Sequence, residues 1–238
     1  AITSGTVAQL VAMLAMGIKK GDEVITQSHT FVATVESILA IGAKPVIVDI
    51  DDTYNMDIND LENAINEKTK LIVPVHMLGN PCKMDEIMNI SKKYNIPVLE
   101  DACEALGGSY KTKVLGTIGD AGIFSLDFAK TITTGEGGMI ITNNKEIYQY
   151  SKEYHDHGHQ SNPNFPRGRD TRVIPGMNYR ITEMQAAVGK VQLGKLDKIL
   201  ELNKERYSAF ENHFPETIEK RELPKHSEPI YDTFIFFF

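Results

Sequence analysis

A lysine, an aspartate and a candidate phosphate cradle are the residues of this sequence whose chemistry fits together. Lys130 follows the apolar run that ends at Ser125, and Asp101 closes the apolar run 97–100. Residues 4–6, Ser-Gly-Thr, precede a helical pattern, and the start of a helix offers free N–H groups and a favourable dipole to a phosphate. In an open parallel sheet, ligands bind beyond the carboxyl ends of the strands, where we expect these residues.

These groups suit the cofactor pyridoxal 5'-phosphate (PLP). A lysine amine forms a Schiff base with its aldehyde, and a carboxylate keeps its pyridinium nitrogen protonated, so that the ring acts as an electron sink. Each group alone has an ordinary explanation, because such a lysine is usually a surface residue, such an aspartate a turn residue and such a Ser-Gly-Thr an N-cap. The hypothesis therefore depends on their combination.

Short apolar runs alternate with helical patterns from residue 21 to residue 142. The expected strands are residues 24–26, 45–49, 71–75, 97–100, 121–125 and 139–142. The expected helices are residues 6–16, 31–41, 58–65, 84–94 and 147–154. This alternation predicts an α/β fold with a mostly parallel central sheet that is sandwiched by helices.

The pattern changes after Lys145. Residues 155–176 are polar and rich in Pro, Gly, Arg and His, which predicts a long loop of the kind that is usually functional or disordered. Residues 180–213 predict one or two long helices. We expect a large PLP-binding domain over residues 1–190, followed at 191–238 by a long helix and the start of a smaller C-terminal α/β domain.

The composition argues against several classes of protein. The 238 residues include 25 Lys and Arg against 32 Asp and Glu, and this net charge of −7 disfavours a nucleic-acid partner. No apolar run approaches the ~20 residues of a membrane helix, so we expect no membrane partner. Two cysteines, Cys82 and Cys103, suit a reducing cytoplasm. The chain begins at Ala1 and ends in an aromatic run, and we expect a fragment of a longer protein.

Several motifs, in order, resemble the DegT/StrS-type sugar aminotransferases, which are fold-type-I PLP enzymes. The resemblance runs from Ser4 to about Arg206. It rests on SGT (4–6), GDEVITQSHTFVAT (21–34), GAKPVIVDID (42–51), EDACEALG (100–107), GDAGIFSLDFAKTITTGEGGMIITN (119–143) and NYRITEMQAAVG (178–189). The segments SLDFAKTITTGEGG and HDHGHQSNPNFPRGRDTR (155–172) are also similar to an 8-amino-3,8-dideoxy-octulosonate transaminase branch.

The resemblance implies roles for individual residues. Lys130 matches the catalytic lysine that carries PLP, and Asp101 matches the partner of the pyridinium nitrogen. Dehydratases of the family place a histidine at the lysine position, so Lys130 argues against their chemistry. The phosphate contacts implied are Ser4, Gly5, Thr6 and Ser125.

Three further cofactor contacts are implied. Phe31 matches an aromatic residue that stacks on the cofactor ring. Asn178 matches an asparagine that reaches the phosphate from the neighbouring subunit, which implies a homodimer with shared active sites. Glu104 lies where relatives often carry His or Gln beside the ring oxygen. Because an ionised glutamate would repel that oxygen and the Asp101 carboxylate, we expect Glu104 to be protonated or turned away.

The long loop and its flanks supply candidates for substrate binding. The histidines of HDHGH (155–159) have no Cys or carboxylate cluster nearby, so we predict no metal and favour a substrate or subunit contact over a solvated loop. Three loop arginines, Arg167 included, suit anionic groups, although such arginines are also common in solvated loops. His76 follows a strand and reads equally well as a substrate contact or as a structural histidine. The substrate candidates are His76, His157, Arg169, Arg172, Tyr179 and Arg180.

Together these features predict PLP-dependent transamination of an anionic oxo-sugar, with Lys130 as general base and acid. By resemblance, the acceptor is a nucleotide-linked keto-deoxy sugar or an 8-oxo-3-deoxy-octulosonate, the donor is glutamate, and the product feeds lipopolysaccharide or another cell-surface polysaccharide. Two alternatives remain open: a non-catalytic PLP-binding or interaction module, and a nicotinamide-dependent reductase. The reductase is disfavoured because residues 135–138 lack the GxGxxG spacing.

Overall fold

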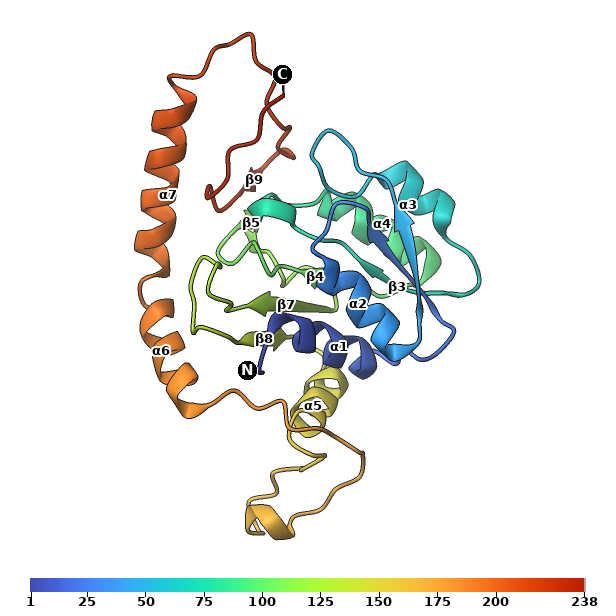
Figure 1. Cartoon of the computed structure of the whole chain (residues 1–238). Coiled ribbons are helices and arrows are strands. Elements are labelled where there is room, and N and C mark those ends of the chain that lie inside the picture. Colours follow the sequence, from blue (N-terminus) through green and yellow to red (C-terminus); the bar gives the residue numbers. More distant parts are fainter. Residues whose placement is uncertain (238) are drawn as a thin grey trace.

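A twisted central sheet forms the body of the molecule in the computed structural model, which describes residues 1–237 (Figure 1). Its strands are β1 (Glu23–Gln27), β2 (Lys44–Val48), β3 (Thr69–Val73), β4 (Leu99–Asp101), β7 (Ala121–Ser125) and β8 (Gly138–Ile141). The order is β2-β1-β3 and β4-β7-β8, and isolated parallel bridges at Ile72–Val98 and Val75–Asp101 join β3 to β4. Only β8 pairs antiparallel among these strands, so the mostly parallel sheet is confirmed.

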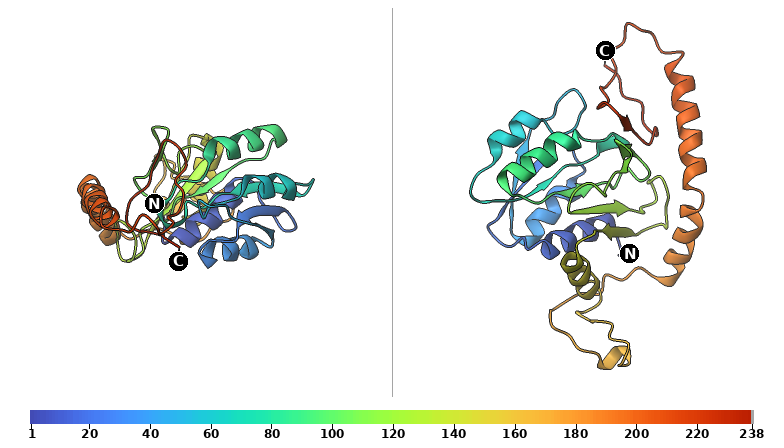
Figure 2. Two further views of the ribbon diagram at one scale, coloured as in Figure 1. Left: turned by 90° about the horizontal axis from the view of Figure 1, so that it is seen from above. Right: turned by 180° about the vertical axis from the view of Figure 1, so that it is seen from behind.

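Helices cover both faces of this sheet, as Figure 2 shows. The helices are α1 (Gly5–Ala15), α2 (Val32–Ile41), α3 (Ile58–Ala64), α4 (Met84–Tyr94), α5 (Lys145–Tyr154), α6 (Glu183–Leu193) and α7 (Leu196–Glu211). Val24 and Leu71 pack with α1, α2 and α5, whereas the next residues, Ile25 and Ile72, pack with α3 and α4. Because successive strand residues point to opposite faces, burial on both faces explains the continuous apolar runs.

The predicted strands and helices are all present, with shifts of up to three residues at their ends. Strand β4 begins at Leu99 and not at Pro97, since proline has no N–H for the ladder. A second small sheet was not predicted. It contains β5 (Ser109–Tyr110), β6 (Lys113–Val114) and β9 (Ser227–Glu228) in the order β6-β5-β9. Two-residue strands carry no periodic pattern, which explains the omission.

An arm extends from this body and comprises the loop 155–178 with α6 and α7 (Figure 1). Neither α6 nor α7 has a buried residue. Helix α6 passes through the expected domain boundary at residue 190, so the chain has no break there, and the division into two domains stays a prediction. Within residues 1–237, no helix is both long and apolar enough to cross a membrane.

Candidate active site

A cavity of about 530 Å³ lies at the carboxyl ends of β4 and β7, beside the start of α1. This volume is within the range of small-molecule and cofactor sites. Eight of the nine residues predicted to contact the cofactor line it: Ser4, Gly5, Thr6, Phe31, Asp101, Glu104, Ser125 and Lys130. The fold therefore brings together residues that are as much as 126 positions apart in the sequence, from Ser4 to Lys130.

Asp101 is held rigidly on the wall of this cavity. Its Oδ2 accepts hydrogen bonds from Gln9 Nε2 at 3.0 Å and from Thr34 Oγ1 at 2.9 Å. Its Oδ1 accepts the backbone N–H of Cys103 at 3.1 Å. Neither Gln9 nor Thr34 is among the residues predicted from the sequence. Gln9 lies four residues after Gly5, and this helical spacing is the signal that could have placed it on the face of α1 that meets the cavity.

Lys130 and Glu104 form an ion pair in the cavity. Lys130 Nζ lies 3.2 Å from Glu104 Oε1, and the two side chains are only 19% and 25% exposed. Glu104 Oε2 accepts the Leu78 N–H at 3.0 Å. The expectation that Glu104 turns away is therefore wrong for this conformation, because its carboxylate points at the lysine amine.

The start of α1 forms the candidate phosphate cradle. A Cβ on Gly5 would lie 2.9 Å from Ser125 Cβ and 3.0 Å from Cys103 Sγ, so only glycine allows this close approach. Ser4 caps the helix, since its Oγ accepts the Val7 N–H at 3.2 Å. The first N–H groups of a helix have no acceptor within it and can bind an anion. The donors at this end of the cavity therefore fit the phosphate of PLP.

The rim of the cavity carries two exposed aromatic side chains, Phe31 at 64% and Phe128 at 79% exposure. The sequence analysis identified Phe31 only. Cys103 also lines the cavity, where burial and then the neighbouring Asp101 raise the pKa of its thiol well above the ordinary value. A protonated thiol is a poor nucleophile. Of these two side chains, Lys130 is therefore the better candidate to attack an aldehyde.

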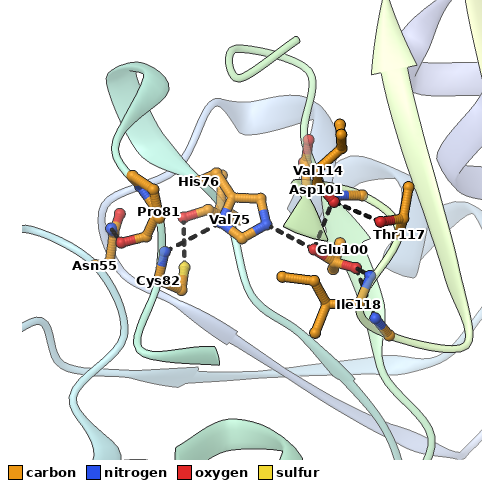
Figure 3. A network of polar contacts seen from close by, with 12 residues as sticks. Asn55, Val75, His76, Pro81, Cys82, Glu100, Asp101, Val114, Thr117 and Ile118 are labelled. Carbon is orange, nitrogen blue, oxygen red and sulfur yellow. Dashed lines mark hydrogen bonds and ion pairs between the residues drawn. The ribbon is translucent and has the colours of Figure 1, made fainter. Parts of the chain in front are cut away.

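His76 is not among the residues that line the cavity, and its ring lies between Cys82 and Glu100 (Figure 3). Its Nδ1 accepts the Cys82 N–H at 3.1 Å, so its Nε2 carries the proton and donates to Glu100 Oε2 at 3.0 Å. Both side chains are completely buried. This geometry fits a structural histidine and not a substrate contact, because a side chain without exposed surface cannot contact a substrate.

Glu100 is a buried carboxylate beside Asp101 with a full set of donors. Besides His76, it accepts the backbone N–H groups of Gly116 at 2.8 Å, Ile118 at 2.5 Å and Gly119 at 2.6 Å. Burial opposes ionisation, but the hydrogen bonds from His76 and from these N–H groups lower the pKa of Glu100. Glu100 thus fixes the loop 116–119 to the strand that presents Asp101.

The remaining predicted residues lie away from the cavity of their own chain. Asn178 is exposed on the arm and bridges to Asp156, which also pairs with Arg180 at 2.6 Å. Tyr179 packs on Tyr154, with ring centroids 6.5 Å apart. Asn178 therefore lies apart from the eight predicted cofactor contacts that line the cavity. The predicted substrate contacts also lie outside the cavity.

The loop of the arm has its own polar centre. Buried His159 pairs through Nδ1 with Asp170, and its Nε2 accepts from Arg172 Nη2 at 2.8 Å. The hydrogen bond from His159 lowers the pKa of Asp170. Arg172, Arg169 and His157 are all exposed, and the guanidinium of Arg172 is engaged with His159. The Arg167 side chain lies outside the described part of the structure.

Over the described residues, no group of three or more His, Cys, Asp or Glu side chains is arranged to hold a metal ion.

Comparisons with known proteins agree with this geometry. The chain matches the DegT/DnrJ/EryC1/StrS aminotransferase family over residues 1–236. It is 37% identical over 234 residues to a GDP-perosamine synthase of Escherichia coli O157:H7, which covers 98% of this chain and 62% of that protein. It is 43% identical over 201 residues to a GDP-perosamine synthase of Caulobacter vibrioides, which covers 84% of this chain and 53% of that protein.

Solved structures show the same fold. The structure of E. coli GDP-4-keto-6-deoxy-D-mannose-3-dehydratase with bound hydrated PLP aligns with a TM-score of 0.90 and 31% identity, over 99% of this chain and 65% of that one. The fold is therefore that of the fold-type-I PLP enzymes. The chain spans less than two thirds of the length of these relatives.

Proposed function

The chain belongs to the DegT/DnrJ/EryC1/StrS aminotransferase family, whose members depend on PLP, and we propose that it transfers an amino group to a nucleotide-linked keto sugar. The observation that carries this proposal is Lys130, which lines the same cavity as Asp101, whose carboxylate is held by three hydrogen bonds. The similar dehydratase fold does not decide between transamination and dehydration. Lys130 supports transamination, because the family resemblance implies a histidine at this position in the dehydratases.

The acceptor proposed is a GDP-linked keto-deoxyhexose. Two GDP-perosamine synthases at 37% and 43% identity support this sugar class over the octulosonate, which is the second candidate. Glutamate is the proposed amino donor, and the product is proposed to enter lipopolysaccharide or another surface polysaccharide. We also propose a cytoplasmic location, which suits a reaction on a nucleotide-linked sugar.

Several residues of the cavity have a defined task in this proposal. When bound, PLP supplies an electron sink for the carbon that loses a proton next to the transferred nitrogen. Asp101 holds the proton on the ring nitrogen, and the start of α1 with Ser125 binds the phosphate. Lys130 removes the proton from the donor's α-carbon and returns one to the acceptor carbon as the reaction runs in reverse. Phe31 covers one face of the ring.

A second copy of the chain is proposed to complete the site. Asn178 is exposed and lies away from its own cavity, as does Arg169. Met184 and Val191 on α6 are 80% and 60% exposed, which is unusual for apolar side chains on a helix unless a partner covers them. In the proposed homodimer, the arm of one subunit brings Asn178 and the exposed Arg169 to the partner's cavity.

The test is a product assay. The PLP-loaded protein is incubated with glutamate and GDP-4-keto-6-deoxymannose, and the sugar is analysed by mass spectrometry for replacement of the carbonyl oxygen by an amino group. Glutamate dependence and an amino sugar would support the proposal. PLP binding without any amino transfer would indicate a binding module, a GDP-sugar that loses its 3-hydroxyl would indicate a dehydratase, and consumption of a nicotinamide cofactor would indicate a reductase.

A further inference from the structure

A strained turn connects the C-terminal segment to the ion pair in the cavity. The turn Met77–Gly79 follows β3, and Leu78 has φ 53° and ψ 38°, in the left-handed region that non-glycine residues rarely adopt. In this conformation the Leu78 N–H donates to Glu104 Oε2 at 3.0 Å, while Glu104 Oε1 pairs with Lys130. The backbone of the turn therefore helps to orient the partner of the proposed catalytic lysine.

Arg221 holds this turn from the opposite side. Its Nη1 donates to the Met77 carbonyl at 3.2 Å, and its Nη2 lies 3.5 Å from the Leu78 carbonyl. Burial lowers the pKa of the Arg221 guanidinium to about 10, so it is still charged at neutral pH. Its planar fork can engage two adjacent carbonyls at once, which the single ammonium of a lysine cannot do. Such a contact can stabilise a strained turn.

The C-terminal segment around Arg221 is fitted to the same turn. The Arg221 N–H donates to the Ile235 carbonyl at 3.2 Å, which fixes the arginine within a backbone pairing of residues 219–221 and 235–237. The Ile230 N–H donates to the Gly79 carbonyl at 3.3 Å. A Cβ on Gly79 would lie 2.2 Å from Ile230 Cγ1, so only a glycine allows this contact. Figure 1 shows the C-terminal segment lying against the body near β5.

We propose that Arg221 is a positioning residue of the active site: it fixes the turn Met77–Gly79, whose Leu78 N–H orients Glu104 and, through Glu104, the amine of Lys130. The role of Lys130 in this inference rests on the proposed function, whereas the contact from Arg221 to the turn does not. The C-terminal segment then sets the geometry of the lysine without contacting the cofactor or the substrate.

Two measurements on the full chain test this proposal, one at the turn Met77–Gly79 and one at the amine of Lys130. Hydrogen exchange followed by mass spectrometry reports the protection of the amides in a peptide that contains the turn Met77–Gly79. The rate at which PLP becomes attached to Lys130, trapped with borohydride and located by peptide mapping, reports the position of the amine. The variants are Arg221→Met and Arg221→Lys. The matched control is Lys220→Met, because the neighbouring Lys220 pairs with Glu211 at 3.0 Å and not with the turn.

We expect Arg221→Met to raise the hydrogen-exchange rate of the turn amides about tenfold. This is the factor expected for the loss of one hydrogen bond to a charged group. Arg221→Lys should restore part of the protection, and Lys220→Met should leave it unchanged. Equal exchange in Arg221→Met and Lys220→Met would overturn the proposal. A uniform rise over the whole chain would also overturn it, since that would show an anchor of the fold and not a clamp on this turn.

For attachment, we expect Arg221→Met to slow trapping at Lys130 about tenfold, because Glu104 no longer holds the amine or accepts the proton that it must lose before attack. In a Glu104→Gln background the same substitution should change the rate less than about twofold, since the connection is already broken. Equal slowing in both backgrounds would overturn the connection through Glu104. If wild-type Lys130 is never labelled, the proposed function fails, while the exchange experiment still decides on the clamp.

Discussion

The cavity and the arm differ in how far their polar side chains find hydrogen-bond and ion-pair partners within one chain. In the cavity, Asp101 has three donors from its own chain, and Lys130 has its own carboxylate partner. On the arm, Asn178 and Arg169 face outward, and α6 buries none of its apolar side chains. The difference indicates that a single chain preorganises the cofactor half of the proposed site. In the proposed homodimer, the partner's arm completes the site with Asn178 and Arg169.

The largest effect is expected on the cavity side, from Lys130→Ala. Without the amine that moves the proton, turnover should fall by about a thousandfold or more. The unfolding midpoint should change little, because the side chain contributes one partly exposed ion pair. Steady-state assays and thermal unfolding of the same preparation check both statements. Turnover within tenfold of wild type would remove Lys130 from the mechanism.

Asp101→Asn should have the next largest effect. The amide keeps the size of the side chain but loses the negative charge that holds the proton on the ring nitrogen, so turnover should fall by about a hundredfold. PLP affinity should fall less, because the phosphate cradle is intact. Single-turnover absorbance and a PLP titration separate the two. Near-normal turnover would show that another group serves the ring nitrogen.

Glu100→Gln tests whether the wall behind the cavity is structural. The amide opposes two donors with its own NH₂ group, and the free energy of unfolding should fall by about 3 kcal/mol at pH 7. Since the folded-state pKa of Glu100 is lowered, its contribution is complete above the unfolded value near 4.3 and is lost as the pH falls through the folded value. The difference between variant and wild type should therefore shrink in acid.

Urea unfolding at pH 7 and at pH 4 or below measures this difference. The matched control is Glu62→Gln, which removes an exposed ion pair to Lys93 at 2.6 Å and should lower the free energy of unfolding far less. Equal losses for the two variants would contradict a structural role for Glu100.

On the arm, Arg169→Ala should raise the KM for the sugar about tenfold, as one charged hydrogen bond to an anionic acceptor would require. The half-reaction with the amino donor should barely change. Arg172→Ala should also disturb the loop, since Arg172 bonds to His159. Stopped-flow measurement of the two half-reactions distinguishes these cases. Equal losses in both halves for Arg169→Ala would mean that the arginine supports the cofactor or the dimer.

Hybrid dimers test whether the arm of one subunit completes the cavity of the other. Mixing inactive Lys130→Ala chains with inactive Asn178→Ala chains gives heterodimers in which one site carries both lesions and the other carries neither. An equal mixture should regain about a quarter of wild-type activity, because half of the dimers are mixed and half of their sites are intact. No recovery, with heterodimers demonstrated by mass spectrometry, would contradict shared sites.

The sequence predicted the sheet, the helices and most of the cavity lining, because these depend on local periodicity and on the carboxyl ends of strands. It did not identify Gln9, Thr34 or Phe128, which a helix face and a turn bring to the cavity. The pairing of Glu104 with Lys130 was also missed. The contact of Arg221 with the turn at Met77 joins residues 144 positions apart, and no local pattern reports such a distance.

The most direct test of the central claim is the location of the cofactor bond. Purified protein is incubated with PLP, reduced with borohydride, digested and mapped by mass spectrometry, with the Lys130→Ala variant as control. The cavity geometry predicts a pyridoxyl group on Lys130 of the wild type and none on the same peptide of the variant. Labelling of any other lysine at equal yield, or no labelling at all, would contradict the assignment of this cavity as a PLP site.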